Sequence, residues 1–214
     1  MCFAVFAAQG QTRILPMGDS TTSSFAGHNS FRRPLWFLLQ DAGFSVDFVG
    51  SQNGVDIANS TPPDPDFDMN HEGHPGWTSA DGANFAGDIA AAQQPDVVML
   101  DLGANDPSNG ILPEETTANL QMIIEDFRAV NPDVTIVLAL PPPSVGDDKH
   151  DMSALKKAIQ AAAKNEKSAG AHVIVVNLGG GFSASKDTFD GAHPNESGEA
   201  KLAKRYFKAL RKVL

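Results

Sequence analysis

Hydrophobic residues follow two periods along this chain, and together they predict an α/β fold. Short runs that are continuously apolar, or that alternate apolar with polar residues, are typical of β-strands. Longer segments with apolar residues three and four positions apart are typical of helices. The predicted strands cover 13–17, 44–49, 96–102, 134–140 and 172–178. The predicted helices cover 29–42, 78–94, 113–131, 151–170 and 194–214.

The alternation of strands with helices predicts a three-layer α/β/α sandwich. Each strand returns beside its neighbour through a helix, so we expect a five-stranded parallel sheet with helices on both faces. Right-handed crossovers then bring the carboxyl ends of the strands to one edge, where ligands bind in such sheets. The loops at that edge contain Ser20, the long irregular segment 51–77, Asn105, the segment 141–152, Asp190 and His193.

Length, charge and cysteine content narrow the class of protein. The 214 residues suit a single domain, expected over 13–214, and we find no internal repeat or linker. A formal net charge of -10 argues against nucleic acid and anionic membranes as partners. Cys2 is the only cysteine, which excludes an intramolecular disulfide. No apolar run approaches the roughly 20 residues of a transmembrane helix, and the oligomeric state is not indicated.

Residues 1–12 are predicted to be separate from this domain. The first residues are small and apolar and resemble the end of a secretory signal, although no basic segment precedes them. We interpret them either as the remnant of a signal or as a short N-terminal arm. Secretion is the favoured localisation, with a cytoplasmic location as the alternative.

Ser20 is the candidate nucleophile. It follows the first predicted strand in the sequence Gly-Asp-Ser at 18–20, where Gly18 permits a sharp turn. The tripeptide alone is equally typical of an ordinary turn. A catalytic role requires a base, an acid that orients the base, and hydrogen-bond donors for an oxyanion.

Asp190 and His193 are the candidate orienting acid and base. They lie three positions apart at the start of the last predicted helix. The carboxylate can accept a hydrogen bond from the imidazole Nδ1–H, which leaves Nε2 free to take the proton of Ser20. Alone, the pattern Asp-x-x-His more often represents a helix-capping aspartate with a surface histidine nearby.

Two further loops contain candidate oxyanion donors. Asn105 follows the third predicted strand, and its side-chain amide can donate a hydrogen bond to a developing oxyanion. An Asx turn that ends the strand is the alternative. Gly76 has no side chain, so its N–H can approach a substrate oxygen closely. Its neighbour Trp77 is expected either to pack under this loop or to line the pocket.

Two clusters raise the question of a metal. The segment 71–74 contains two histidines and a glutamate, but their spacing is not that of the His-Glu-x-x-His zinc motif. Three aspartates alternate in the proline-rich segment 64–68, without the glycine and terminal glutamate of a calcium loop. We interpret this second segment as a solvated acidic loop, with calcium binding as the alternative.

Taken in order, these motifs resemble the SGNH (GDSL-like) hydrolases over essentially the whole chain. In detail the chain is similar to carbohydrate esterase family three, which includes acetyl xylan esterases. The closer resemblance rests on Gly18-Asp19-Ser20-x-Thr22, Asn29-Ser30-Phe31-Arg32, Asp47-Phe48-Val49-Gly50-Ser51 and His71-Glu72-Gly73-His74-x-Gly76-Trp77. The resemblance implies the SGNH hydrolase fold with a flavodoxin-like parallel sheet.

The resemblance also implies a mechanism. Ser20 is expected to be the nucleophile, His193 the general base and then the general acid, and Asp190 the residue that orients the histidine. The oxyanion hole is expected to comprise the backbone N–H groups of Ser20 and Gly76 and the side chain of Asn105. An acyl-serine intermediate forms and is released by water, without need of a metal or cofactor.

The implied substrate is a small-molecule or polysaccharide ester. Short acyl esters of sugars, such as the acetyl groups of acetylated xylan, are favoured. The alternatives are an SGNH enzyme acting on lysophospholipids, thioesters or small aryl esters and, from a different class, a non-catalytic carbohydrate-binding protein. Asp19, Trp77 and Asp106 are assigned to substrate binding.

Overall fold

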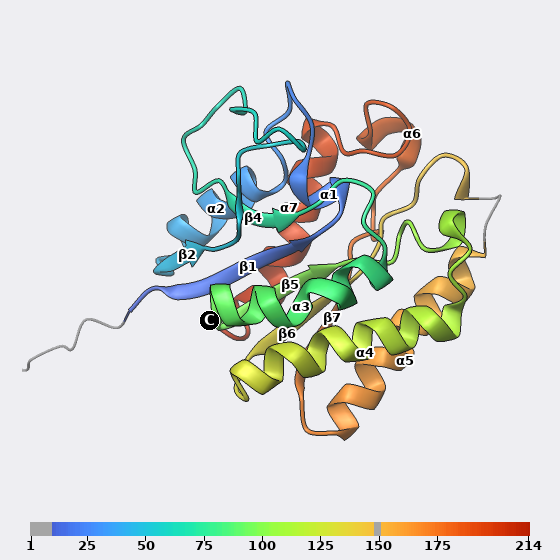
Figure 1. Ribbon diagram of the computed structural model, residues 1–214. Helices are drawn as coiled ribbons and strands as arrows, with labels where there is room; N and C mark the ends of the chain where they lie inside the picture. The colour runs from blue at the N-terminus through green and yellow to red at the C-terminus, as the bar shows by residue number, and fades with distance from the viewer. Residues whose placement is uncertain (1–9, 148–150) are drawn as a thin grey trace, which may run out of the picture.

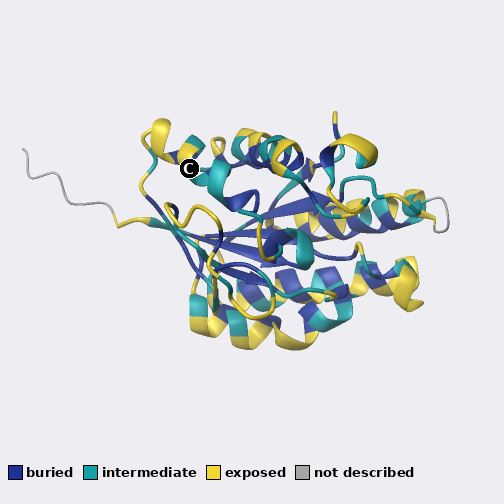
Figure 2. Ribbon diagram, turned by 90° about the horizontal axis from the view of Figure 1, so that it is seen from above, coloured by how far each residue is buried: buried dark blue, intermediate teal, exposed yellow. Residues whose placement is uncertain are grey.

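The protein, described by a computed structural model over residues 10–147 and 151–214, has three layers. Most of the predicted N-terminal segment 1–12 lies outside the described residues. A central β-sheet is covered by helices on both faces (Figure 1). Seen from above, buried strands form the middle layer and the exposed faces of the helices form the outside (Figure 2). The predicted α/β/α sandwich is confirmed.

All predicted strands and helices are present, with shifted ends and several short additions. The strands are β1 Thr12–Gly18, β2 Val46–Phe48, β3 Gln52–Asn53, β4 Asn70–Gly73, β5 Val97–Asp101, β6 Thr135–Leu140 and β7 His172–Asn177. The helices are α1 Ser20–Ser23, α2 Arg32–Asp41, α3 Ser79–Gln93, the 3-10 helix η1 Pro107–Asn109, α4 Pro113–Val130, α5 Met152–Ser168, α6 Ala184–Asp187 and α7 Glu196–Leu210. Of the helices within the described ranges, none is both long and apolar enough to cross a membrane.

The sheet is mostly parallel and is arranged around β1. β2 pairs with the first half of β1, and β4 pairs with its end, where Gly18 lies beside Gly73. β5 lies on the other side of β1 and is followed by β6 and β7. The five predicted strands correspond to β1, β2, β5, β6 and β7, and they run parallel as expected.

Within the described residues the sheet has seven strands, so the prediction of five omitted two short ones. β3 and β4 lie in the segment 51–77, which was predicted to be irregular, and they pair with each other in antiparallel fashion. They are too short to show alternation, and Asn and Gly are depleted in strands. Pairing with β1, which is a tertiary contact, therefore decides their structure. It also directs the chain after β4 to the edge where β1 ends.

Alternate residues of the strands pack against opposite helix layers. In β1, Leu15 and Met17 are buried against α3, α4 and α5, whereas Ile14 is buried against α2 and α7. In β5, Val98 and Leu100 face the same layer as Leu15. Since both faces of the sheet are covered, the central strands carry no solvated face, which explains their continuous apolar runs.

Local signals fix where the helices begin. The side chains and backbone N–H groups of Thr78 and Asp81 bind each other in a capping box at the start of α3. Pro113 occupies the first position of α4, as predicted. The helix predicted at 29–42 begins later, at Arg32, because Ser30 has a φ of 69°, which an α-helix does not accommodate.

A fully buried guanidinium joins the turn after β1 to the long loop. Arg32 is 0% exposed. It donates hydrogen bonds to the carbonyl oxygens of Thr22 (3.0 Å) and Ser23 (3.3 Å), and to those of Gly54 and Met69. Burial lowers the pKa of Arg32 to about 9. The ring of carbonyl acceptors offsets the cost of removing this charge from water.

We expect Arg32→Leu to lower the free energy of unfolding by about 3 kcal/mol or more, because each buried carbonyl that loses its donor costs about 1–3 kcal/mol. Urea denaturation followed by circular dichroism measures this change. Arg211→Leu, at an exposed position after α7, is the matched control and should change stability by less than about 1 kcal/mol. Equal losses in the two variants would contradict the role assigned to Arg32.

Candidate active site

The turn between β1 and α1 presents Ser20 at the carboxyl edge of the sheet. β1 ends at Gly18, Asp19 caps α1, and Ser20 is the first residue of that helix. A Cβ atom on Gly18 would lie 2.7 Å from the carbonyl oxygen of Asp101 and closer still to the hydroxyl of Thr22. Only glycine therefore fits where the strand turns into the helix.

Ser20 opens into a small cleft with a volume of about 110 Å³. This volume is well below the roughly 300–1,000 Å³ of sites for drug-sized ligands. A larger hollow of about 250 Å³ lies between η1 and the first turns of α4 and α5, but it contains none of the predicted catalytic residues. The cleft is lined by Asp19, Ser20, Thr21, Asp101, Ala104, Asn105, Pro141, Pro142, Ser144, Asp147, Met152, Ala192 and His193.

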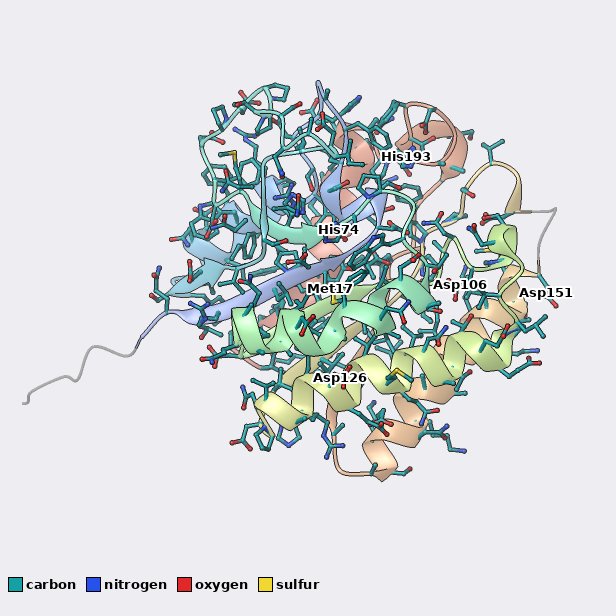
Figure 3. The ribbon with its side chains drawn as sticks, viewed as in Figure 1. Met17, His74, Asp106, Asp126, Asp151 and His193 are labelled. Atoms are coloured by element: carbon teal, nitrogen blue, oxygen red, sulfur yellow. The ribbon has the colours of Figure 1, made fainter. Side chains whose placement is uncertain are left out.

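The structure brings the three predicted triad residues together. The Oγ atom of Ser20 lies 2.9 Å from Nε2 of His193. Nδ1 of His193 lies 2.6 Å from Oδ2 of Asp190. The other carboxylate oxygen accepts hydrogen bonds from the backbone N–H groups of Ala192 (2.9 Å) and His193 (2.8 Å). Figure 3 shows His193 in the segment before α7, at the edge where β1 ends.

The charge of Asp190 fixes the donor and acceptor roles of the hydrogen bonds in this triad. Partial burial alone raises the pKa of Asp190, but the hydrogen bonds from His193 and Ala192 outweigh it and hold the pKa at about 2. The carboxylate is therefore ionised at neutral pH and can only accept, so Nδ1 of His193 carries the hydrogen. Nε2 is then the acceptor for the hydroxyl of Ser20.

The three predicted oxyanion donors lie at the carboxyl edge of the sheet, but they differ in their hydrogen-bond partners and in whether they line the cleft. Ser20 N–H, in the first turn of α1, is paired with no acceptor in the described part of the chain. The amide of Asn105, which lines the cleft, donates to Trp77 O at 2.9 Å and to Asp19 at 3.3 Å. Gly76 is exposed and does not line the cleft. A glycine is favoured at position 76 because its φ is 85°. Close contact with neighbouring atoms is not the reason, since an added Cβ would meet nothing within 4 Å.

Two buried carboxyl groups line the cleft beside Ser20. Burial raises the pKa of Asp101 to about 8, and the charge of Asp19 adds to this effect. Burial also raises the pKa of Asp19, to about 6, against the hydrogen bond from Thr21 and the attraction of His193. The hydroxyl of Tyr206 donates to Asp101 at 3.2 Å. At neutral pH Asp101 therefore keeps its proton, and the pair carries one negative charge rather than two.

Asp19, which was predicted to bind substrate, does line the cleft, but it is only 3% exposed. Its carboxylate accepts hydrogen bonds from Thr21 N–H and from Asn105. Both contacts orient other parts of the site. Sequence reasoning missed Asp101, although a single acidic residue in an otherwise apolar central strand was an available signal.

Trp77 packs under its loop, which was the alternative to lining the pocket. Its ring stacks on His74 with centroids 3.9 Å apart and on Phe85 at 5.4 Å. It also packs against the core beneath α3 and is not among the residues that line the cleft. The assignment of its side chain to substrate binding is therefore corrected.

The assignment of Asp106 to substrate binding is wrong, because its side chain is 0% exposed. Its carboxylate accepts hydrogen bonds from the backbone and hydroxyl of Ser79 and from the hydroxyl of Thr116. Asp106 thus joins the start of α3 to α4. Figure 3 shows it near the start of α3 and apart from His193.

The residues considered for a metal site each have other partners. Asp66 forms an ion pair with Arg33 at 2.6 Å, and Asp64 accepts a hydrogen bond from Asn29 at 2.8 Å. The third aspartate of this loop accepts from the backbone N–H of Phe48. The glutamate of β4 binds the following histidine. Within 10–147 and 151–214, no three His, Cys, Asp or Glu residues are grouped to hold a metal ion.

Sequence reasoning also missed three aromatic residues next to the triad, Phe25, His28 and Phe189. The ring centroids of Phe25 and His193 lie 4.3 Å apart, and His28 stacks on Phe189. No motif contains these residues, and only folding brings their two segments together. The one available signal was that Phe189 directly precedes Asp190.

Comparison with known proteins identifies the family. The sequence profile of the GDSL-like lipase/acylhydrolase family matches residues 17–201. A multidomain esterase of Ruminococcus flavefaciens is 29% identical over 226 positions, which cover 95% of this chain but only 29% of that protein. A family 3 carbohydrate esterase of Clostridium thermocellum is 32% identical, with a TM-score of 0.79 and coverage of 95% and 98%. An acetyl esterase crystallised with an acetate ion is 27% identical, with a TM-score of 0.81 and the same coverage.

Fold and site together define the class as that of the carboxylic ester hydrolases. The serine, histidine and aspartate lie at the carboxyl edge of a mostly parallel sheet, and the three relatives described above are esterases. The chain belongs to the GDSL-like lipase/acylhydrolase family. The resemblance to the SGNH hydrolases and to carbohydrate esterase family three is confirmed.

The raised pKa of Asp101 predicts that stability falls as pH rises. Its ordinary pKa is 3.8, against about 8 in the folded protein. Between these values the folded state binds a proton that the unfolded chain has released, so the free energy of unfolding decreases with increasing pH. Asp101→Asn cannot ionise and should show a smaller decrease in urea denaturation between about pH 4 and pH 8.

The control for this comparison is Asp133→Asn, at an exposed carboxylate. It should keep the pH dependence of the wild-type protein. A pH dependence in Asp101→Asn as steep as that of the wild type would show that Asp101 does not hold a proton in the folded state.

Proposed function

We propose that the chain hydrolyses short acyl esters, acetyl esters above all, of carbohydrates such as acetylated xylan. The observation that carries this proposal is the series of hydrogen bonds from Ser20 through His193 to Asp190. Ser20 and His193 line a cleft of about 110 Å³. The similarity to a family 3 carbohydrate esterase and to an acetyl esterase supports the substrate class. Secretion fits a polysaccharide substrate and stays a prediction, since residues 1–9 lie outside the described range.

The reaction would proceed through an acyl-serine intermediate. Oγ of Ser20 attacks the ester carbonyl carbon while Nε2 of His193 takes its proton, and the carboxylate of Asp190 stabilises the imidazolium. The tetrahedral intermediate collapses when Nε2–H returns the proton to the alcohol oxygen, which leaves the acyl group on Ser20. His193 then takes a proton from water as the water oxygen attacks the acyl-serine carbon. The second tetrahedral intermediate collapses when the bond to Oγ breaks and Nε2–H returns the proton to Oγ, which releases the acid and restores Ser20.

The oxyanion would compete with Asp19 for the side chain of Asn105. The N–H that Asn105 directs to Asp19 lies at the longer distance, 3.3 Å, so it is held less firmly than the N–H bound to Trp77 at 2.9 Å. This weaker bond is the one that an oxyanion would replace. Ser20 N–H is the second donor, and a shift of the exposed turn at Gly76 toward the cleft would add the third.

A second candidate function is the hydrolysis of longer acyl esters or thioesters. A more open groove of about 290 Å³ continues from Asn105 past Met152 and the segment 144–147. This groove would give a longer chain room beyond the cleft. By contrast, Pro141 and Pro142 line the cleft itself and leave little space beside the nucleophile. The chain length of the preferred ester therefore distinguishes the two functions.

Ser20→Ala should reduce the release of acetate from acetylated xylo-oligosaccharides by at least about 10³-fold, since loss of the nucleophile removes the covalent route. Ser168→Ala, at an exposed serine at the end of α5, is the matched control and should retain wild-type turnover. Mass spectrometry after rapid quenching should detect an added acetyl group on the wild-type chain and none on Ser20→Ala. Undiminished turnover by Ser20→Ala would contradict the assignment of Ser20 as the nucleophile.

A series of 4-nitrophenyl esters with two, four and eight carbons in the acyl group tests the acyl specificity. We expect kcat/KM to be highest for the acetyl ester and to fall with chain length, because the small cleft excludes longer chains. Fastest turnover of the eight-carbon ester would instead favour the second candidate function and place the acyl chain in the open groove.

A further inference from the structure

Three aromatic side chains form a continuous group next to the catalytic imidazole. Phe25 is tilted against His193, and its ring meets the edge of Phe189 at 5.9 Å. His28 stacks on Phe189 with centroids 4.0 Å apart and an interplanar angle of 16°. The rings come from the connection between α1 and α2 and from the connection between α6 and α7, which lie side by side at the edge of the sheet (Figure 1).

Phe189 remains 43% exposed, although the backbone around it is held by hydrogen bonds. Phe189 N–H donates to the carbonyl of His193 at 3.0 Å. The side chain of Asn195 donates to the carbonyl of Thr188 at 3.1 Å, and the hydroxyl of Thr188 accepts from Gly191 N–H. The backbone that carries the exposed Phe189 is therefore held in place at the edge of the site.

The chemistry of the triad places the alcohol part of the ester on this side. Nε2 of His193 is the atom that returns a proton to the leaving alcohol, so that oxygen must lie next to the imidazole. The carbonyl oxygen, in contrast, must point toward Ser20 N–H and Asn105. The group attached to the alcohol oxygen then leaves the cleft past His193, where Phe25 and Phe189 stand.

We propose that the exposed part of Phe189, with His28 stacked on one face of its ring and Phe25 in a T-shaped contact with it, forms a platform for the pyranose ring that carries the ester, an inference that rests on the proposed function. The C–H face of a pyranose is apolar and fits an aromatic surface, while its hydroxyl groups lie at the rim. The ring nitrogens of His28 provide hydrogen-bonding groups at the edge of the platform. Asp190 is ionised and partly exposed beside Phe189, which favours a neutral sugar over a phosphate-bearing alcohol.

Two acetyl esters test the platform: methyl 2-O-acetyl-xylopyranoside, whose alcohol is a sugar, and ethyl acetate, whose alcohol is not. Phe189→Ala should lower kcat/KM for the sugar ester by about fivefold to tenfold, the worth of one aromatic contact. It should leave ethyl acetate within about twofold of the wild type. Phe189→Leu keeps apolar bulk without a flat face and should behave like Phe189→Ala, whereas Phe189→Trp should retain turnover of the sugar ester.

Phe37→Ala is the matched control, because Phe37 is an exposed phenylalanine on α2 that touches no residue of the site. It should leave both rates unchanged. An equal loss on both esters in Phe189→Ala would mean that the ring only supports His193, and would overturn the proposal. Unchanged rates of Phe189→Ala on both esters would overturn the proposal as well. They would favour binding of the sugar in the groove lined by residues 144–147.

Binding to a catalytically inactive chain separates this proposal from the proposed function. NMR titration of Ser20→Ala with the sugar ester should give saturable binding that weakens by about fivefold to tenfold when Phe189→Ala is added. If the wild type does not hydrolyse the sugar ester but binding still weakens with Phe189→Ala, the esterase assignment is contradicted and the platform is supported. Equal binding with and without Phe189→Ala would overturn the platform even if the esterase assignment holds.

Discussion

The catalytic edge depends on one hydrogen bond, from Oγ of Ser20 to Nε2 of His193, between residues 173 positions apart. Each partner is fixed by contacts within its own turn. The carboxylate of Asp19 caps the helix that carries Ser20, and Asp190 binds both the ring and the backbone N–H of His193. Only the parallel sheet, which collects the loops after its strands at one edge, brings the two turns to bonding distance.

A second constraint is the amount of negative charge that the site can hold. The attraction between the carboxylate of Asp19 and His193 is strongest when the imidazole is protonated, which is the state that the proposed mechanism would form during attack. The same carboxylate repels an oxyanion that approaches Asn105. Because Asp101 keeps its proton at neutral pH, the buried pair supplies one charge to balance these opposed effects instead of two.

Sequence analysis predicted most of the architecture, because strands buried on both faces and amphipathic helices have distinct periods. It also identified Ser20, Asp190 and His193, which the structure brings together, because short turns place the residues of each motif locally. It did not predict β4, whose structure depends on pairing with β1, or the buried partners of Asp106. Those features arise from contacts between distant segments, for which a single sequence carries no periodic signal.

The two sides of the triad impose different kinds of selectivity. On the side of Asn105, the cleft is small and its walls include two adjacent prolines, so under the proposed function its volume would limit the size of the acyl group. On the side of His193, the surface is aromatic and includes Phe189, which is 43% exposed. A polysaccharide ester needs this asymmetry, since its acyl group is small and its alcohol is a long chain that must leave the cleft. Steric exclusion would therefore select the acyl group strongly, while stacking would select the alcohol weakly and tolerate many sugars.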